Sequence, residues 1–346
     1  MTYDKLFEKY KVNDNLILQN RVVMAPLTRC FADENNVPTD LMAEYYGRRG
    51  DSGLIIAEAT LVSKLAQGYP NQPGIYNQAQ MSAWEKINNK VHENGAKIFC
   101  QIFHSGRISH ETYHEQQPID PSSIGYDGRI PRTELNYETP RALETKEVKE
   151  VVTEFIQAAI NSVNAGFDGV EIHAANGYLT DQFLHQETNQ RSDEYGGSTQ
   201  NRARFTLEII DGIIASIGKE KVGIRISPHA YLHLGHTSGD EETFKYLLKE
   251  IEKREISYVH TGTFDDHTKV DYLNGKVSEF IRENYKGTVI ANGSYEASEG
   301  NQLLKDEKFD LFAIGRPFIS NPDLITKLKT NAVLTQYDEN MLGELV

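Results

Sequence analysis

The chain has 346 residues, of which 39% are hydrophobic and 25% charged, and its formal net charge is −14. This length suits one β/α barrel with insertions, and the composition is that of a globular protein with a large buried core. The acidic balance argues against nucleic acid as a partner, because phosphate binding needs clustered Lys and Arg. Two cysteines, Cys30 and Cys100, are too few for a disulfide framework, a four-thiolate metal site or an iron–sulfur cluster.

The N-terminal segment MTYDKLFEKYK has no apolar run after a basic patch, so it does not resemble a signal peptide. No apolar stretch approaches the length that spans a membrane. We therefore expect a cytoplasmic protein with no membrane partner. The sequence leaves open whether it is a monomer or a homodimer.

Short β-branched, apolar runs alternate with longer amphipathic segments along the chain. In order, the runs are 21–26, 54–60, 97–104, 169–174, 221–227, 257–262, 288–293 and 311–315. Most are continuously hydrophobic, which is typical of parallel strands covered on both faces. Helical patterns lie between them, for example at 82–95, 145–166, 201–218 and 240–256, with a last one at 321–329. The alternation predicts a single domain over residues 1–346, built as a closed (β/α)8 (TIM) barrel.

An open doubly wound sheet is the alternative fold, but no G-x-G-x-x-G follows the first predicted strand. Residues 3–18 precede that strand and are expected to cap the bottom of the barrel. Residues 105–144 form a long loop after strand 3, in which several Pro and Gly residues break any helix. Loops of this length are uncommon unless functional, so we expect a lid over the barrel mouth.

Barrel enzymes place their sites at the C-terminal ends of the strands. The residues at these positions are rich in hydrogen-bonding groups and poor in paired carboxylates, which disfavours glycosidase chemistry. Gly293 and Gly315 end strands seven and eight, and Arg316 follows the second, a pattern that suits a phosphate site. Arg225 lies in an apolar strand and must meet an anion or carbonyl groups, because a buried guanidinium without partners is costly.

One motif is misleading. Residues 110–114 read HETYH and match the H-E-x-x-H pattern of zinc proteases. That chemistry needs a stable helix with both histidines on one face and a third ligand elsewhere. Pro118 and Pro121 follow closely within the predicted loop, so we predict no metal site.

Five blocks together resemble the Old Yellow Enzyme family, in the right order and over nearly the whole chain. They are RVVMAPLTR (21–29), QIFHSGRISH (101–110), HAANGYLTDQFLHQETNQRSDEYGGSTQNRARF (173–205), VGIRISP (222–228) and IGRPFISNPDL (314–324). The resemblance implies FMN lying across the barrel mouth, with NADPH or NADH as the reductant. It also implies a small electrophilic substrate: an enone or related electrophile with an electron-poor C=C bond, a quinone or a nitro compound.

The resemblance further implies a role for each matching residue. Flavin contacts would come from Ala25, Pro26, Leu27, Thr28, Ala59, Gln101 and Arg225, and phosphate contacts from Gly293, Ser294, Gly315 and Arg316. Thr28 would donate to the flavin O4, Gln101 would bond the pyrimidine edge, and Arg225 would lie beside N1 and C2=O. His173 and Asn176 would bind the substrate carbonyl oxygen, and Tyr178 would donate the proton. Tyr69, Phe103 and Phe318 are expected to line the substrate pocket.

The chain departs from common family patterns at Phe103, where many members have Trp, and at Asn176, where some have His. Its C-terminus also stops soon after the last predicted helix, which puts in doubt any cofactor cover from a longer tail. Flavin–iron–sulfur relatives share the barrel but need a cysteine cluster that this chain lacks. A flavin-binding redox sensor, or a quinone or nitro reductase without an ene-reductase role, remains as the alternative function.

Overall fold

The computed structural model describes residues 3–230 and 232–346. In this part of the chain, eight parallel strands close into a barrel: β3 (Val22–Met24), β4 (Leu54–Ile56), β6 (Lys97–Phe103), β9 (Gly169–Ala174), β10 (Val222–Ile226), β11 (Tyr258–Thr261), β12 (Val289–Ala291) and β13 (Leu311–Ile314). Each strand pairs with the next in chain order, and β13 pairs with β3 to complete the ring. A short strand, β5 (Thr60–Leu61), extends the pairing on β6. The predicted (β/α)8 barrel and its eight strands are confirmed.

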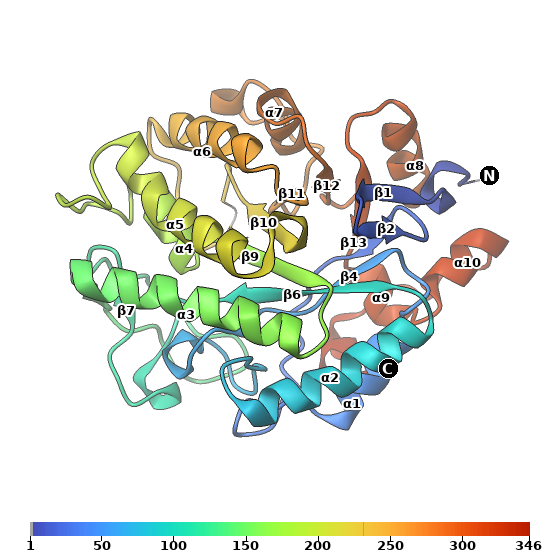
Figure 1. Cartoon of the computed structure of the whole chain (residues 1–346), viewed down its shortest axis with the longest axis horizontal. Coiled ribbons are helices and arrows are strands. Elements are labelled where there is room, and N and C mark those ends of the chain that lie inside the picture. The colour runs from blue at the N-terminus through green and yellow to red at the C-terminus, as the bar shows by residue number, and fades with distance from the viewer. Residues whose placement is uncertain (1–2, 231) are drawn as a thin grey trace.

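Helices surround the barrel (Figure 1). They are α1 (Asp40–Gly47), α2 (Gln78–Glu93), α3 (Thr145–Asn164), α4 (Leu179–Leu184), α5 (Thr199–Ile217), α6 (Asp240–Arg254), α7 (Val277–Asn284), α8 (Ala297–Lys305), α9 (Arg316–Ser320) and α10 (Leu324–Thr330). Helix α2 illustrates how the sequence sets them. Asn77 caps its N-terminus by accepting a hydrogen bond from the Gln80 N–H, and Trp84, Ile87 and Val91 recur at helical spacing on its buried face.

The strands are apolar on both faces because two cores cover them. Inside the barrel, Val23, Leu54, Ile56, Phe99, Ile290 and Leu311 pack together. Their neighbours, such as Val22 and Ile55, point outward into a second core beneath the helices. This arrangement explains why the strand sequences show continuous hydrophobicity rather than alternation.

An N-terminal hairpin caps the bottom of the barrel, as expected for residues 3–18. It consists of β1 (Tyr10–Asn13) and β2 (Leu16–Leu18), which pair antiparallel. Leu16 and Leu18 join the core inside the barrel. The preceding turn is tied to α8, since the backbone N–H of Lys5 donates to Asn301 Oδ1 at 3.0 Å.

The long loop after β6 reaches the barrel mouth. It contains a 3-10 turn at Glu111–Tyr113 and two short paired strands, β7 (Ile119–Asp120) and β8 (Arg141–Ala142). Arg107 fastens it: the buried guanidinium donates to the carbonyl oxygens of Ile124 (3.1 Å) and His233 (2.6 Å). The loop therefore lies against the segment that follows β10.

The HETYH segment is part of this loop and is not an α-helix. The His110 ring bonds the Thr112 hydroxyl, whereas His114 Nε2 lies 3.0 Å from the Ser109 hydroxyl. The two histidines thus have separate partners. No group of three metal-ligating side chains occurs among the residues that the structure describes.

Two buried arginines hold the C-terminal segment against the barrel. Arg29 donates to the Met341 carbonyl at 3.0 Å, and Arg49 to the Val346 carbonyl at 2.8 Å. Both guanidiniums pack on the Tyr45 ring. Across the described ranges, no helix has the length and apolar character needed to cross a membrane.

Candidate active site

The predicted site residues follow β3, β4, β6, β9, β10, β12 and β13 or lie at their C-terminal ends. All strands of a parallel barrel end on the same side, so these residues share the barrel mouth. The strand ladder places two of them next to each other, because Arg225 on β10 pairs with His173 on β9.

His173, near the end of β9, is 4% exposed. Burial, and then the nearby charge of Arg225, hold its pKa well below the usual value for histidine, so the ring is neutral at physiological pH. Its Nδ1 is buried and has no hydrogen-bond partner among the described residues. A neutral imidazole keeps one N–H donor, and this ring can therefore bind a carbonyl oxygen without carrying a charge.

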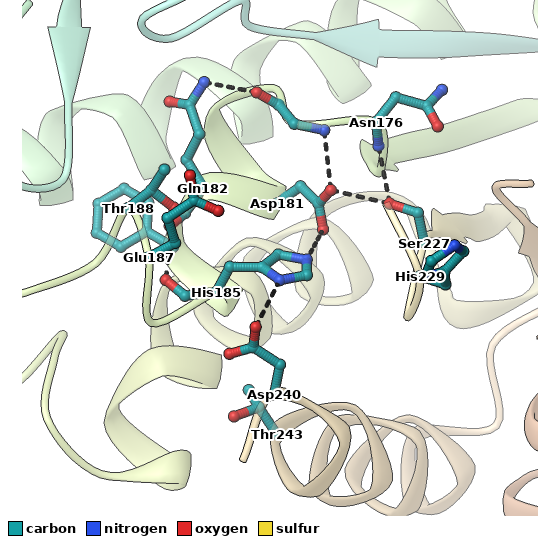
Figure 2. A network of polar contacts seen from close by, with 12 residues as sticks. Asn176, Asp181, Gln182, His185, Glu187, Thr188, Ser227, His229, Asp240 and Thr243 are labelled. Atoms are coloured by element: carbon teal, nitrogen blue, oxygen red, sulfur yellow. Dashed lines mark hydrogen bonds and ion pairs between the residues drawn. The ribbon is translucent and has the colours of Figure 1, made fainter. Parts of the chain in front are cut away.

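Asn176 and Gly177 make a tight turn after β9. Both have left-handed backbones, with φ of 61° and 78°. The Asn176 backbone N–H donates to Ser227 Oγ at 2.8 Å, while its side-chain Oδ1 is buried without a partner in the described part of the chain. Figure 2 shows this turn beside the polar network that supports it. The backbone is therefore fixed, and the unsatisfied Oδ1 can accept a hydrogen bond from a ligand, whereas the carboxamide nitrogen is the end that can donate one.

Tyr178 ends the turn and is 8% exposed. Its hydroxyl lies 2.7 Å from the hydroxyl of Tyr69. The rings of Phe103 and His173 lie edge-on to it, with centroids at 4.6 and 5.1 Å, and the ring of His233 at 5.5 Å. The structure therefore brings Tyr69, Phe103 and Tyr178 together.

Arg225 is 7% exposed. Its Nε donates to the Thr261 carbonyl at 3.2 Å, and Nη2 lies 3.5 Å from Asn292 Oδ1. Within the described residues it forms no ion pair with a carboxylate. The site thus keeps a positive charge that carbonyl and amide oxygens solvate but do not neutralise, as a binder of an electron-rich group requires.

Gln101 is oriented by a buried carboxylate. Its Nε2 donates to Glu171 Oε1 at 2.8 Å, and His260 Nδ1 lies 2.9 Å from Glu171 Oε2. All three side chains are buried. Since the amide nitrogen faces Glu171, the carbonyl oxygen of Gln101 is the end that can accept a hydrogen bond from a ligand.

The segments after β12 and β13 suit an anion. Gly293 has φ of 149°, and a Cβ at this position would lie 2.3 Å from the Asp266 Cβ, so only glycine fits. The Ser294 hydroxyl donates to the Phe264 carbonyl at 2.8 Å. Arg316 follows Gly315, is exposed, and lies over the rings of Phe264 (4.7 Å) and Tyr337 (5.6 Å). A guanidinium held on aromatic faces keeps its N–H donors for an anion.

The residues after β3 and β4 form one side of the mouth. Ala25 and Ala59 are buried, whereas Pro26, Leu27 and Thr28 are half-buried. The backbone N–H groups of Arg29 and Cys30 donate to Glu58 Oε2 at 3.1 and 2.8 Å. This buried carboxylate holds the segment in place.

Phe318, on α9, is fully buried in the outer core. Its carbonyl accepts hydrogen bonds from the Arg49 guanidinium at 3.0 and 2.8 Å. These contacts account for the residue by packing, and its place in the substrate pocket stays a prediction.

Sequence reasoning missed the polar residues that support the site. They are Glu171 and His260 inside the barrel, Asp181, His185 and Asp240 behind the turn after β9, and Arg107 and His233 at the mouth. One signal was available: Glu171 stands within an apolar strand, as Arg225 does. A charge in such a strand indicates a buried partner.

The barrel mouth thus gathers an arginine without a carboxylate partner, neutral hydrogen-bonding groups and segments that suit an anion, and comparisons with known proteins identify the class of protein. Residues 5–334 match the model of the NADH:flavin oxidoreductase / NADH oxidase family. The chain is similar to 12-oxophytodienoate reductase 1 of Oryza sativa subsp. japonica, with 39% identity over 339 residues, 97% of this chain and 88% of that protein.

Two solved structures are also similar. Morphinone reductase in complex with tetrahydroNAD has 40% identity and a TM-score of 0.90, covering 97% of this chain and 93% of that one. The old yellow enzyme homologue from Zymomonas mobilis has 35% identity and a TM-score of 0.91, covering 98% and 96%. The chain belongs to the NADH:flavin oxidoreductase / NADH oxidase family, which includes the Old Yellow Enzymes. It is an FMN-dependent NAD(P)H oxidoreductase of the ene-reductase type.

Proposed function

We propose that this enzyme reduces electron-poor C=C bonds, such as those of enones. The arrangement of His173, Asn176 and Tyr178 supports the proposal most strongly: the His173 ring and the Asn176 carboxamide nitrogen can each donate to an oxygen, beside a tyrosine hydroxyl that can release a proton. The similar proteins named as reductases of 12-oxophytodienoate and morphinone point to the same class of substrate.

The residues present fit FMN. Gly293, Ser294, Gly315 and Arg316 would hold its phosphate, since the glycine backbone and the exposed guanidinium suit an anion. Ala25, Pro26, Leu27, Thr28 and Ala59 would contact the ring system. Gln101 would accept from the pyrimidine edge, and Arg225 would stabilise negative charge at N1 and C2=O. When bound, FMN supplies the chemistry of hydride acceptance from NADPH or NADH and hydride donation to the alkene.

His173 and Asn176 would bind the carbonyl oxygen of the substrate. This oxygen gains negative charge as hydride reaches the β-carbon, and donors fixed in advance lower the barrier. His173 is neutral, so it contributes a hydrogen bond rather than a full charge. Some family members have histidine at the position of Asn176. The Asn176 amide can play the same role, because its nitrogen also donates a hydrogen bond.

Tyr178 would donate the proton to the α-carbon. The Tyr69 hydroxyl, 2.7 Å away, can pass a proton to it or solvate the phenolate that remains. Burial, and then the neighbouring Tyr178, raise the pKa of Tyr69 well above its usual value, so Tyr69 is protonated throughout the neutral range. Phe103 packs edge-on against Tyr178 and would form the adjoining wall of the pocket.

The test is Tyr178→Phe, which removes one oxygen and should leave FMN content and reduction by NADPH intact. Reduction of cyclohexenone should slow by about two to four orders of magnitude, the usual contribution of a positioned general acid. A quinone, which accepts hydride without carbon protonation, should be affected far less. Reoxidation of the reduced enzyme by each substrate, followed in rapid-mixing experiments, makes the comparison internal.

Equal slowing of both substrates would mean that Tyr178 shapes the pocket rather than donating a proton. No slowing would assign the proton to water or to another residue. The alternative role as a redox sensor, or as a quinone or nitro reductase, predicts no steady-state turnover of NADPH or NADH with any enone by the wild type. A purified protein that is colourless and takes up no added FMN would overturn the assignment of the cofactor.

A further inference from the structure

Three charged side chains lie completely buried behind the substrate-binding turn. They are Asp181 and His185 on and just after α4, and Asp240 at the start of α6, here called the Asp181 cluster. None is more than 1% exposed. His185 Nε2 lies 3.2 Å from Asp181 Oδ1, and His185 Nδ1 lies 3.0 Å from Asp240 Oδ2 (Figure 2).

The cluster is connected to the turn by hydrogen bonds. Asp181 Oδ2 accepts from the Gly177 backbone N–H at 2.9 Å and from the Ser227 hydroxyl at 2.8 Å. Ser227 Oγ in turn accepts from the Asn176 backbone N–H. One oxygen of Asp181 therefore fixes two successive N–H groups of the turn: that of Gly177 directly and that of Asn176 through Ser227.

The turn needs this support. Asn176 has φ of 61°, in the left-handed region that most non-glycine residues avoid and that Asn tolerates better than most. Gly177 is equally constrained, because a Cβ on it would lie 2.6 Å from the His233 Cβ. Such a conformation persists only when its surroundings hold it, and the acceptors on Asp181 and Ser227 do so.

The rest of the cluster stabilises the charge of Asp181. His185 stands between two aspartates as their shared counter-ion. Asp240 is further stabilised by the backbone N–H groups of Gln186 (3.0 Å) and Thr237 (2.9 Å). Since a buried charge without partners is very costly, the three side chains form one unit.

We propose that Asp181 is a positioning residue of the reductase reaction, which acts through Ser227 and the backbone of Asn176 and Gly177. It holds the side chains of Asn176 and Tyr178 at the geometry that the substrate's oxygen and α-carbon require. The inference rests on the proposed function of Asn176 and Tyr178. Asp181 is fully buried behind the turn, so it would act only through these groups.

The first test measures the turn directly. Hydrogen exchange of the Asn176 amide should speed up about tenfold in FMN-loaded Ser227→Ala, which removes its acceptor. Exchange of the Gly177 amide should speed up in Asp181→Asn, because a neutral carboxamide is a weaker acceptor than a carboxylate. Asp168→Asn is the matched control. Asp168 also accepts from a backbone N–H, that of Ile98 at 2.9 Å, but it lies before the N-terminal end of β9. The proposal would be overturned if the exchange rates in the turn were unchanged in Ser227→Ala. It would also be overturned if Asp168→Asn raised them as much.

The second test separates positioning from a general loss of structure. Reoxidation of the reduced Ser227→Ala enzyme by cyclohexenone should slow about 10- to 100-fold, the usual consequence of a displaced transition-state donor. Reoxidation by dioxygen does not require a carbonyl oxygen to be bound, so its rate should change by less than about twofold. Equal slowing with both oxidants would mean that the substitution damages the flavin site as a whole, and the proposal would fall.

A third variant checks that Ser227 acts through Asn176. In an Asn176→Ala background, adding Ser227→Ala should slow the enone reaction by a smaller factor than it does in the wild type, because one of the two side chains to be positioned is gone. If Ser227→Ala slows the enone reaction by the same factor in both backgrounds, the proposal is contradicted. If Asp181→Asn does not fold, Ser227→Ala still decides the outcome.

The two proposals fail differently. If the wild type reduces no enone, the proposed function is wrong, while hydrogen exchange still judges the support of the turn. If the wild type is active and Ser227→Ala matches it, only the positioning role is wrong.

Discussion

Two histidines of this barrel are fully buried and contact carboxylates, yet they carry different charges. His260 lies against Glu171 inside the barrel, and His185 lies between Asp181 and Asp240 behind the turn. Burial and the charge of Arg225, a ladder neighbour of His260, outweigh Glu171 and lower the pKa of His260. Burial also lowers that of His185, but the charges and hydrogen bonds of Asp181 and Asp240 outweigh it and raise the pKa to about 10. Burial alone therefore does not set the charge of a histidine here.

The balance of neighbouring charges sets it, and the two outcomes suit their locations. Near the mouth, a neutral His260 adds no second positive charge beside Arg225. Behind the turn, a charged His185 is the shared partner of two buried aspartates. The comparison predicts different consequences for the same substitution at the two positions.

The largest effect is expected for His185→Gln. Glutamine can donate one hydrogen bond but supplies no charge, so two buried carboxylates would lose their counter-ion. Removing one partner of a buried ion pair costs about 3–5 kcal/mol of unfolding free energy. His260→Gln should cost about 1 kcal/mol, the value of one ordinary hydrogen bond, because a neutral ring is replaced by a neutral amide.

Urea unfolding of the two FMN-loaded variants at neutral pH measures this difference. Equal losses would show that both histidines have the same charge in the folded protein. His185→Lys offers a check, since an ammonium keeps the charge and should recover part of the stability that glutamine loses.

The second effect is a pH dependence. A histidine whose folded-state pKa is raised contributes stability that is fully present below its unfolded pKa of about 6.5 and is lost as pH rises toward the folded value. For His185 that window runs from about 6.5 to about 10. Wild-type stability relative to His185→Gln should therefore fall steadily between these pH values.

Unfolding free energies at several pH values in this window, taken as the difference between the two proteins, isolate the contribution of His185. His260 should behave in the opposite way, because a lowered folded pKa costs stability as pH falls below about 6.5. A wild-type advantage over His185→Gln that stays constant up to pH 10 would mean that His185 is neutral.

The barrel and its mouth were predictable from the sequence because short, continuous segments determine both. Each strand is one apolar run, and parallel strands bring the residues that follow them to one end, so the grouping of His173, Asn176 and Arg225 follows from the fold. Tyr69 was expected only weakly, yet its hydroxyl meets that of Tyr178 across 109 positions.

The supporting clusters were not predictable in this way. Asp181 and Asp240 meet at His185 although 59 positions separate them, because the segments after β9 and β10 fold over each other. No periodic pattern in the sequence predicts such a long-range contact. Glu171 was a readable exception, since a carboxylate within GVEIHA has to find buried donors, but its partners Gln101 and His260 stand on two other strands.

The smallest effect expected is on the redox potential, through Glu171. Glu171→Gln removes a buried negative charge from beneath the flavin site, while its amide oxygen can still accept from Gln101. Electrons added to FMN would then meet less repulsion, so the midpoint potential should become more positive. A change on the order of 1 kcal/mol corresponds to about 20 mV for a two-electron couple.

The control is Asp168→Asn, which removes a carboxylate just before the N-terminal end of the same strand, β9, and should leave the potential unchanged. A reductive titration against a reference dye measures both variants. An unchanged potential, or a shift to a more negative one, in Glu171→Gln would contradict this prediction and would mean that the main role of Glu171 is to orient Gln101.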